Sequence, residues 1–180
     1  TRQANTSTIS VGRTPTITDR LNAVVMLSAT TGCVVGGLGN NTNLVLCTTD
    51  GSNWTINYNT ATSGTDDELN NISFPSSSVA YAVGNTGVIL KSIDAGANWT
   101  AQTSGVTGDL QDIVCSDTNT CIVVGDAGAI LKTTDGGTTW TMLTSGITTD
   151  LNAISGASAT SLWAGGADGE EAAALEDLAV

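Results

Sequence analysis

Two eight-residue stretches share one pattern: Ser-Ile-Asp-Ala-Gly-Ala-Asn-Trp at residues 92–99 and Thr-Thr-Asp-Gly-Gly-Thr-Thr-Trp at residues 133–140. A shorter copy, Thr-Thr-Asp-Gly-Ser-Asn-Trp, occupies residues 48–54. The tryptophans that close the three copies are 45 and 41 residues apart. A fixed period in this range is the sequence signature of a repeat architecture.

The repeat extends well outside this turn. Leu-Asn-Asn-Ile at residues 69–72, Leu-Gln-Asp-Ile at 110–113 and Leu-Asn-Ala-Ile at 151–154 recur every 41 residues. Each unit holds four short apolar or Thr-rich runs bounded by turn residues, a pattern typical of strands. Four antiparallel strands at this period make one propeller blade, and blades bury their faces by stacking. The sequence therefore predicts an all-β protein, a β-propeller of four-stranded antiparallel blades. A right-handed solenoid built from the same strands is the alternative.

The repeat count predicts three full blades with partial blades at both ends. Full repeats cover approximately residues 19–58, 68–104 and 109–145, a partial repeat covers 150–169, and an irregular or helical tail covers 170–180. Thr1-Arg2-Gln3 aligns with the start of a fourth strand. The chain is then a single propeller domain or a propeller fragment. Because an unpaired strand edge invites another chain, residues 1–10 and 160–180 are candidate joining parts for self-association.

The turn resembles the Asp-box, or BNR repeat, of sialidases and many secreted propellers. The longer stretch at residues 124–141 resembles the repeat of photosystem II assembly-factor-like propellers, and the likeness covers about residues 19–169. The resemblance implies that Asp and Gly hold the turn between the third and fourth strands while Trp packs beneath it. The residues with this structural role are Asp50, Trp54, Asp94, Gly96, Trp99, Asp135, Gly137 and Trp140. The first copy departs from the family pattern by being one residue shorter.

The chain has four cysteines and no histidine. Cys115 and Cys121 flank a short loop between the first two strands of a blade, where a hairpin would bring them together. Cys33 and Cys47 lie on the second and third strands of the first blade and could face each other. An even count that can pair within blades favours disulfides and an oxidising compartment. Metal binding is a rival explanation, weakened by the absence of His and of a C-x-x-C pair, and buried free thiols are another.

Charge and hydropathy exclude several classes of partner. Lys and Arg number 5 against 17 acidic residues, which gives a net charge of −12 and disfavours nucleic acid and anionic membranes as partners. No apolar run approaches the length of a membrane span. No cofactor and no metal ion is expected. Five N-x-S/T sequons mark candidate N-glycosylation sites at Asn5, Asn40, Asn53, Asn71 and Asn98.

The sequence also predicts that the chain is not an enzyme. The sialidase resemblance implies an arginine cluster for the substrate carboxylate, but Arg2, Arg13 and Arg20 all lie before or at the very start of the first full blade. Asp109 and Asp112 are close in sequence, and a carboxylate pair can serve a glycosidase. The absence of His excludes Ser-His-Asp and Cys-His nucleophile systems. A glycan-processing enzyme of the sialidase type, or a fragment of one, is kept as the alternative function.

The photosystem II assembly-factor resemblance implies a basic, arginine-rich partner surface, which these blades lack, so we expect only the fold to carry over. The predicted function is a non-catalytic extracellular or cell-surface scaffold for structure, adhesion or self-assembly, with a periplasmic location as a variant. Its partner would be a protein or a glycan. Candidate binding loops are residues 37–43 and 57–67, because irregular additions to a regular repeat often carry binding.

Overall fold

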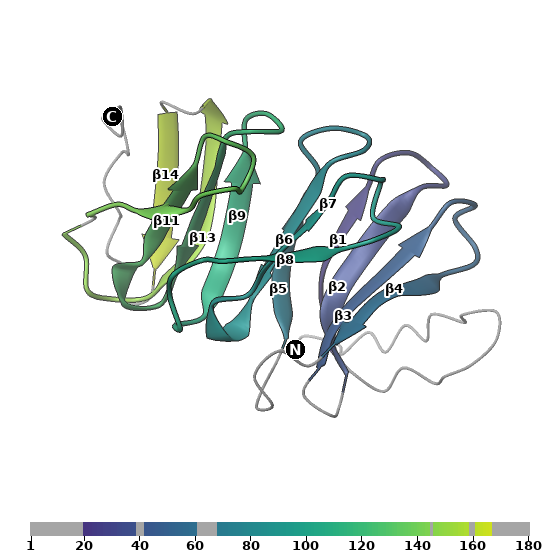
Figure 1. Ribbon diagram of the computed structural model, residues 1–180, viewed down its shortest axis with the longest axis horizontal. Coiled ribbons are helices and arrows are strands. Elements are labelled where there is room, and N and C mark those ends of the chain that lie inside the picture. The colour runs from purple at the N-terminus through teal and green to yellow at the C-terminus, as the bar shows by residue number, and fades with distance from the viewer. Residues whose placement is uncertain (1–19, 39–41, 61–67, 145, 159–160, 167–180) are drawn as a thin grey trace, which may run out of the picture.

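The computed structural model describes residues 20–38, 42–60, 68–144, 146–158 and 161–166. They form four separate antiparallel sheets that stand side by side in chain order (Figure 1). The first blade contains β1 (Leu21–Met26), β2 (Gly32–Leu38), β3 (Thr42–Thr48) and β4 (Thr55–Thr60). The second contains β5 (Leu69–Ser73), β6 (Ala80–Gly84), β7 (Ile89–Ser92) and β8 (Thr100–Gln102).

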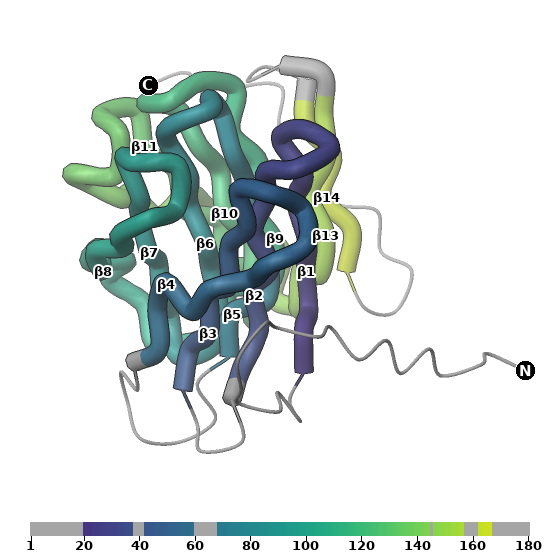
Figure 2. The backbone as a smooth tube through the Cα atoms, turned by 90° about the vertical axis from the view of Figure 1, so that its right-hand side faces the viewer, coloured from purple at the N-terminus to yellow at the C-terminus, as the bar shows by residue number. Residues whose placement is uncertain are grey.

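The third blade contains β9 (Leu110–Cys115), β10 (Cys121–Gly125), β11 (Ile130–Thr133) and β12 (Thr141–Met142). The fourth sheet has two described strands, β13 (Leu151–Ser158) and β14 (Ser161–Gly166). In the described part of the chain, helical structure is confined to two 3₁₀ turns, η1 (Asn85–Gly87) and η2 (Asp126–Gly128), each between the second and third strands of its blade. In the side view β1, β9 and β13 lie toward one edge, and β4 and β8 lie toward the opposite edge (Figure 2).

The prediction of an all-β propeller with four-stranded antiparallel blades is confirmed. Each strand pairs only within its own repeat, in the order first to fourth, and the sheets remain separate. A solenoid would instead add corresponding strands of successive repeats to shared sheets, so that alternative is wrong. The predicted tail at 170–180 and the candidate joining residues 1–10 lie outside the described residues.

The hydrophobic core is divided into three layers, one between each pair of successive blades. In the layer between the first two blades, Val35 and Val45 meet Leu69 and Leu90. The second layer packs Tyr81 and Ile89 against Ile113 and Val123, and the third packs Ile122 and Ile130 against Leu151 and Leu162. Alternation along each strand explains this arrangement, because neighbouring residues point to opposite faces. Tyr81 and Ala82 of β6, for example, enter different layers.

Side chains on the first strands join each blade to the next. Asn22 Nδ2 donates to the carbonyl oxygen of Leu69 at 2.9 Å, and Asn70 Nδ2 donates to the carbonyl oxygen of Leu110 at the same distance. The amide of Ile154 donates to Asp112 Oδ2 at 2.8 Å. The first two bonds join the Leu-Asn motif of one repeat to the leucine of the next. In the third blade Gln111 instead bonds Asp126, and Asp112 makes the contact to the next first strand.

The strand ends define two rims of the molecule. The Asp-box rim carries the loops that follow the first and third strands of each blade, including residues 93–99 and 134–140. The linker rim carries η1, η2 and the linkers at residues 103–109 and 143–150, which connect one blade to the next. The Asp-box turns therefore lie at the opposite end of the strands from the blade-to-blade linkers.

Candidate functional site

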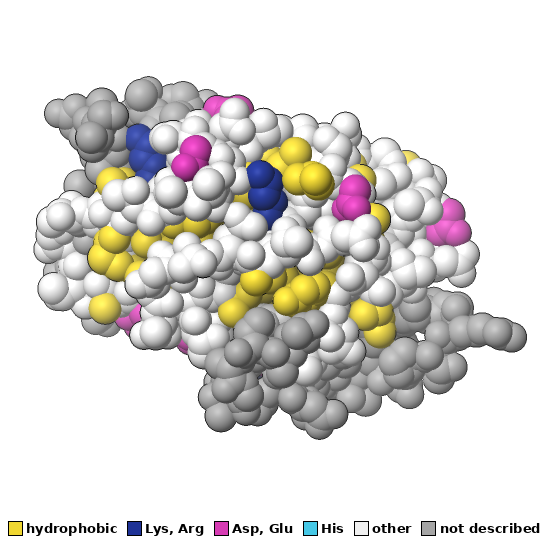
Figure 3. All heavy atoms as spheres, viewed as in Figure 1, with side chains coloured by type: hydrophobic (Ala, Val, Ile, Leu, Met, Phe, Trp, Pro, Cys, Tyr) yellow, Lys and Arg dark blue, Asp and Glu magenta, His cyan; other side chains and the backbone are white. Residues whose placement is uncertain are grey.

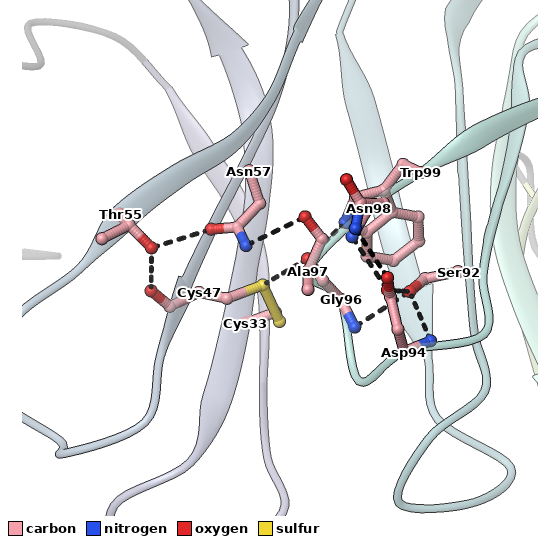
Figure 4. Close-up of a disulfide and its surroundings, with 10 residues drawn as sticks. All are labelled: Cys33, Cys47, Thr55, Asn57, Ser92, Asp94, Gly96, Ala97, Asn98 and Trp99. Carbon is pink, nitrogen blue, oxygen red and sulfur yellow. Dashed lines mark hydrogen bonds between the residues drawn. A yellow bond between two sulfur atoms is a disulfide. The ribbon is translucent and has the colours of Figure 1, made fainter.

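The Asp-box turn of the second blade is held by one carboxylate and one hydroxyl (Figure 4). Asp94 Oδ1 accepts the amide of Asn98 at 2.8 Å, and Asp94 Oδ2 accepts Asn98 Nδ2 at 2.7 Å. Ser92 Oγ donates to Asp94 and accepts the amide of Gly96, both at 2.9 Å. Turn amides that have no ladder partner are thereby satisfied within eight residues.

The same turn needs backbone conformations that side chains disfavour. Ala95 has φ of 60° and Gly96 has φ of 85°. Trp99 is only 8% exposed and its Nε1 donates to the carbonyl oxygen of Gly96 at 2.9 Å. These contacts are what a structural turn requires, with the indole both filling space and fixing the glycine peptide.

The third blade repeats this arrangement with different donors. Asp135 accepts the amide of Thr139 at 2.9 Å and the Thr139 hydroxyl at 2.6 Å. Gly137 has φ of 82°. Trp140 is half-buried, and its Nε1 has no hydrogen-bond partner in the described structure. It packs edge-on against Tyr81, with ring centroids 6.3 Å apart.

The shorter turn of the first blade keeps the carboxylate but changes the packing. Asp50 Oδ1 accepts the amides of Ser52 and Asn53, at 2.9 and 2.7 Å. Thr48 Oγ1 accepts the amide of Gly51, which has φ of 72°. Trp54 is half-buried, whereas Trp99 is buried. The turn that is one residue shorter therefore keeps the carboxylate network, and its indole is half-buried as Trp140 is in a full-length turn.

Hydrogen bonding lowers the pKa of all three turn aspartates. The side chain of Asn98 contributes most to the low pKa of Asp94, and the amide of Asn53 does the same for Asp50. For Asp135, the bond from the Thr139 hydroxyl contributes most and lowers the pKa to about 2. A carboxylate that stays ionised at neutral pH cannot act as a general acid there. These groups are suited to holding turns rather than to proton transfer.

Both predicted disulfides are present. Cys33 bonds Cys47 across β2 and β3, and Cys115 bonds Cys121 across β9 and β10. Each pair occupies directly opposed positions of an antiparallel ladder. Metal ligation and free thiols are thereby excluded for these four residues. Within the described residues, no group of His, Cys, Asp and Glu is arranged to hold a metal ion.

The first disulfide also contacts the next blade (Figure 4). Cys47 Sγ lies 3.6 Å from the carbonyl oxygen of Gly96, a contact without a hydrogen bond because a disulfide sulfur carries no proton. A Cβ atom on Gly96 would lie 2.8 Å from both sulfurs. Asn57 Nδ2 donates to the carbonyl oxygen of Ala97 at 3.4 Å. The Asp-box turn of the second blade therefore rests on the first.

Asp109 and Asp112, the candidate glycosidase pair, each serve a different contact between blades. Asp109 Oδ1 accepts the amide of Thr86 at 2.9 Å. Asp112 accepts bonds from Asn71 Nδ2 and from the amides of Ile113 and Ile154. Burial raises the pKa of Asp112, against the lowering effect of those bonds. Its acceptor sites are used within the protein, which makes it a bridge between three blades.

The remaining predicted sites are only partly described. Asn53 and Asn98 donate their amide hydrogens to Asp50 and Asp94, and half-buried Asn71 donates to Asp112. Asn5 and Asn40 lie outside the described residues, as do most of the loop at 57–67 and the centre of the loop at 37–43. Glycosylation of any sequon stays a prediction.

A groove of about 830 Å³ lies on the linker rim of the third blade. We call it the η2 groove. One wall is the linker segment 105–108, the floor is η2 with Ala129, and the other wall is residues 142–144 and 146–148. The second wall lies directly on η2, because a Cβ on Gly128 (φ of 71°) would lie 2.1 Å from the carbonyl oxygen of Ile147.

The described lining of the η2 groove is largely apolar and contains one carboxylate, that of Asp126. Met142 is 57% exposed, and Val106, Leu143 and Ile147 are half-buried. Asp126 accepts Gln111 Nε2 at 3.0 Å and the amide of Asp109 at 3.3 Å. The sequence interpretation missed this site. The signal available to it was the pair Met142-Leu143, which replaces Ala101-Gln102 of the preceding repeat.

Charged side chains are sparse on one face of the molecule. On the face shown in Figure 3, uncharged atoms dominate, with scattered carboxylates and few Lys or Arg side chains. Among the described residues, Arg20, Lys91 and Lys132 are the basic side chains. In the described part of the chain, no helix is long and apolar enough to cross a membrane.

The sequence profile of the family described as photosynthesis system II assembly factor YCF48 matches residues 6–168. The chain belongs to the YCF48 family. Among curated proteins, none matches the sequence. Family membership agrees with the predicted BNR-type propeller and with its likeness to assembly-factor repeats.

Solved structures of YCF48 have the same fold. A YCF48 bound to a D1 peptide superposes with a TM-score of 0.67 at 19% identity, over 84% of this chain and 48% of that chain. YCF48 from Cyanidioschyzon merolae gives a TM-score of 0.64 at 17% identity, over 85% of this chain and 50% of that one. The chain thus spans about half the length of the YCF48 structures it matches. At these identities the likeness establishes the fold alone.

A glycoside hydrolase is similar in fold as well. The GH74 enzyme of Niastella koreensis superposes with a TM-score of 0.62 at 21% identity, over 83% of this chain and 26% of the enzyme. This likeness also concerns the fold alone.

The predicted function, an extracellular or cell-surface scaffold for structure, adhesion or self-assembly, is wrong. Membership in the YCF48 family overturns it, and the sialidase-type alternative is not supported either. The error came from treating the missing arginine-rich surface as evidence against an assembly factor. Surface charge can change while the buried repeat positions are kept, because those positions form the core layers between the blades.

Proposed function

We propose that this chain is a non-catalytic, polypeptide-binding propeller module of the photosystem II assembly-factor type. The observation that carries the proposal is the family match over residues 6–168. One YCF48 structure is described as bound to a D1 peptide, which makes a polypeptide segment the first class of partner to consider.

The geometry of the described residues supports a binding role over a catalytic one. The Asp-box carboxylates are used in turns, and Asp109 and Asp112 are used between blades. The η2 groove is concave and largely apolar, and these are features of a binding site. Asp109 and Asp112, the carboxylate pair considered for catalysis, accept hydrogen bonds from backbone amides of neighbouring blades instead of facing a substrate site.

The two disulfides support work in an oxidising, non-cytosolic compartment. The proposal does not need an extracellular location. It does require a protein partner rather than a glycan, since the family and its peptide-bound structure concern protein assembly.

The test is a binding scan with synthetic peptides that tile the D1 polypeptide, read by fluorescence anisotropy against the purified, disulfide-bonded chain. We expect saturable binding of at least one peptide and no binding of its scrambled version. If none of the D1 peptides in the set binds saturably, the proposal is contradicted. Release of sugar from a sialoside or another glycoside by the chain would contradict the non-catalytic part of the proposal.

A further inference from the structure

We infer that the η2 groove binds an extended, neutral-to-basic segment of a partner polypeptide, with an aliphatic side chain against Met142 and a Lys or Arg beside Asp126. This inference rests on the proposed polypeptide-binding function and names its site and the chemistry of its ligand.

The apolar surface of the groove calls for an aliphatic side chain. Met142 is more than half exposed, although it lies beside the half-buried Leu143 and Ile147. Methionine adapts to ligands of varied shape because it is unbranched and polarisable, and it is common on binding surfaces. The volume of about 830 Å³ lies in the range typical of ligand sites. Covering this surface would remove apolar area from water, which favours binding.

The segments that line the groove contain three backbone amides without a described partner. The amides of Thr107 and Gly108 on one wall, and of Thr144 on the other, make no hydrogen bond to any described residue. An extended peptide presents carbonyl oxygens at regular intervals and can satisfy such donors on both sides. A purely apolar ligand has no acceptors for such donors, whereas a peptide backbone has them.

The charge of the groove selects against an acidic segment. Asp126 lines it, and Asp109 and Asp150 flank it at the two linkers. Asp150 Oδ1 accepts the amide of Ala127, and its Oδ2 accepts no hydrogen bond from a described residue. No Lys or Arg is among the described residues that line the groove, and the whole chain carries a net charge of −12. Complementarity therefore requires a neutral or basic partner segment.

The second blade provides an internal comparison. Its repeat places Ala101 where the third blade has Met142, and Asn85 where the third blade has Asp126. The backbone is otherwise alike, since Gly87 packs against the carbonyl oxygen of Val106 as Gly128 packs against that of Ile147. The two residues that would select an aliphatic and basic segment are thus specific to the third blade.

The test uses three blocked octapeptides: alternating Leu and Lys, alternating Leu and Glu, and alternating Ser and Lys. Each is titrated into the ¹⁵N-labelled, disulfide-bonded chain and followed by the amide signals of Thr107, Gly108 and Thr144. We expect saturable shifts with the Leu–Lys peptide, and at least about tenfold weaker binding of the other two. Leu–Glu tests the charge, and Ser–Lys tests the aliphatic contact at unchanged charge.

The variants carry the residues of the second blade, so the fold accepts them at equivalent positions. Met142→Ala should weaken Leu–Lys binding by about fivefold or more and leave Ser–Lys binding unchanged. Asp126→Asn should weaken Leu–Lys binding by about threefold at low salt and reduce its salt dependence. Met26→Ala is the matched control, because Met26 is 47% exposed but lies on β1, outside the groove. It should change nothing.

Several outcomes would overturn the inference. The first is that the Leu–Lys peptide shifts amide signals away from the groove, and the second is that the Leu–Glu peptide binds equally well. The third is an unchanged affinity of Met142→Ala for the Leu–Lys peptide. The last is that a glycan, cellohexaose, titrated in the same way, shifts the groove signals more strongly than the peptides do. Groove signals that move with protein concentration alone would assign the groove to a second copy. If a D1 peptide binds without moving the groove signals, the inference fails while the proposed function stands. If Leu–Lys binds the groove but no D1 peptide binds, the proposed function fails while the inference stands.

Discussion

The junction between the first and second blades and the junction between the second and third use the same positions with different chemistry. Cys33 of β2 and Cys47 of β3 face each other across the first blade, where Tyr81 and Lys91 face each other across the second. In both junctions this pair supports the Asp-box turn of the following blade. At the first junction the support is a disulfide whose sulfurs lie against Gly96.

At the second junction the support is polar and aromatic. Lys91 Nζ donates to the carbonyl oxygen of Gly136 at 2.6 Å and lies 5.5 Å from the centroid of the Tyr81 ring. The Tyr81 hydroxyl donates to the carbonyl oxygen of Thr118 at 2.9 Å. A Cβ atom on Gly137 would lie 3.1 Å from the side chain of Gln102 and 3.3 Å from the ring of Tyr81. Lys91 and Tyr81 thus support the Asp-box turn of the third blade, as the Cys33–Cys47 disulfide supports that of the second.

The difference shows that the turn requires a close-fitting support rather than a particular one. A disulfide sets a rigid surface, since it allows little movement of its sulfurs. Gln and Lys side chains can move aside by rotation about their own bonds. We therefore expect the first junction to tolerate added volume less well than the second.

Gly96→Ala should have the largest effect on this comparison. The added Cβ would clash with two fixed sulfurs 2.8 Å away, at a residue with φ of 85°. We expect a loss of about 4 kcal/mol in the free energy of unfolding, from backbone strain and overpacking together. Gly137→Ala, the matched control, should lose about 1–2 kcal/mol, because its main contact can rotate away. Urea denaturation measures both, and equal losses would contradict the difference between the junctions.

Removing the disulfide comes next in size. Replacing both Cys33 and Cys47 by Ala opens a loop with a sequence separation of 14 and should cost about 3 kcal/mol. The same replacement at Cys115 and Cys121, with a separation of 6, should cost about 2 kcal/mol. Denaturation under non-reducing conditions compares the two variants. In addition, Gly96→Ala should destabilise the variant that lacks Cys33 and Cys47 less than it destabilises the native chain. If the two losses in the free energy of unfolding simply add, the disulfide and Gly96 are not sterically coupled.

Lys91→Met tests the polar support of the second junction. The variant keeps most of the aliphatic stem but removes the bond to Gly136, so the free energy of unfolding should fall by about 1 kcal/mol. Ile93→Ser serves as the control, since Ile93 is 72% exposed, and should change stability by less than about 0.5 kcal/mol. Thermal unfolding followed by circular dichroism measures both. A neutral Lys91→Met would show that the packing of Tyr81 alone supports the turn.

The smallest expected effect is the pH dependence of stability that comes from Asp94 and Asp135 in the two Asp-box turns. The pKa of Asp135 is lowered to about 2, so the unfolded chain takes up a proton near pH 4 while the folded chain does not. Stability from this group is complete above the unfolded pKa and is lost as pH falls toward 2. Asp135→Asn should therefore flatten the stability profile between pH 4 and pH 2, and Asp94→Asn should do likewise at the other turn, where the pKa is also lowered. An unchanged acid slope in both variants would contradict the link.

The parts of the structure that sequence reasoning reached are those formed within one repeat. The four-strand order and the pairing of Cys115 with Cys121 depend on neighbours a few residues apart, and both are confirmed. The contact between Gly96 and the Cys33–Cys47 disulfide joins different repeats, and the sequence offered no means of placing it. The η2 groove was missed for the same reason, since its two walls come from linkers on either side of a whole blade.

The sequence by itself determined the repeat, the strand order within each blade and the residues that form the turns, because these follow from local periodicity and local hydrogen bonding. Tertiary structure alone decided which side chains support each turn and where a groove remains open. Both depend on how one blade stacks on the next, and stacking brings together residues about one repeat apart, such as Asn71 with Asp112 and Lys91 with Gly136. A local sequence pattern does not reveal such pairs, because the residues that flank one partner in the sequence do not depend on the identity of the other partner.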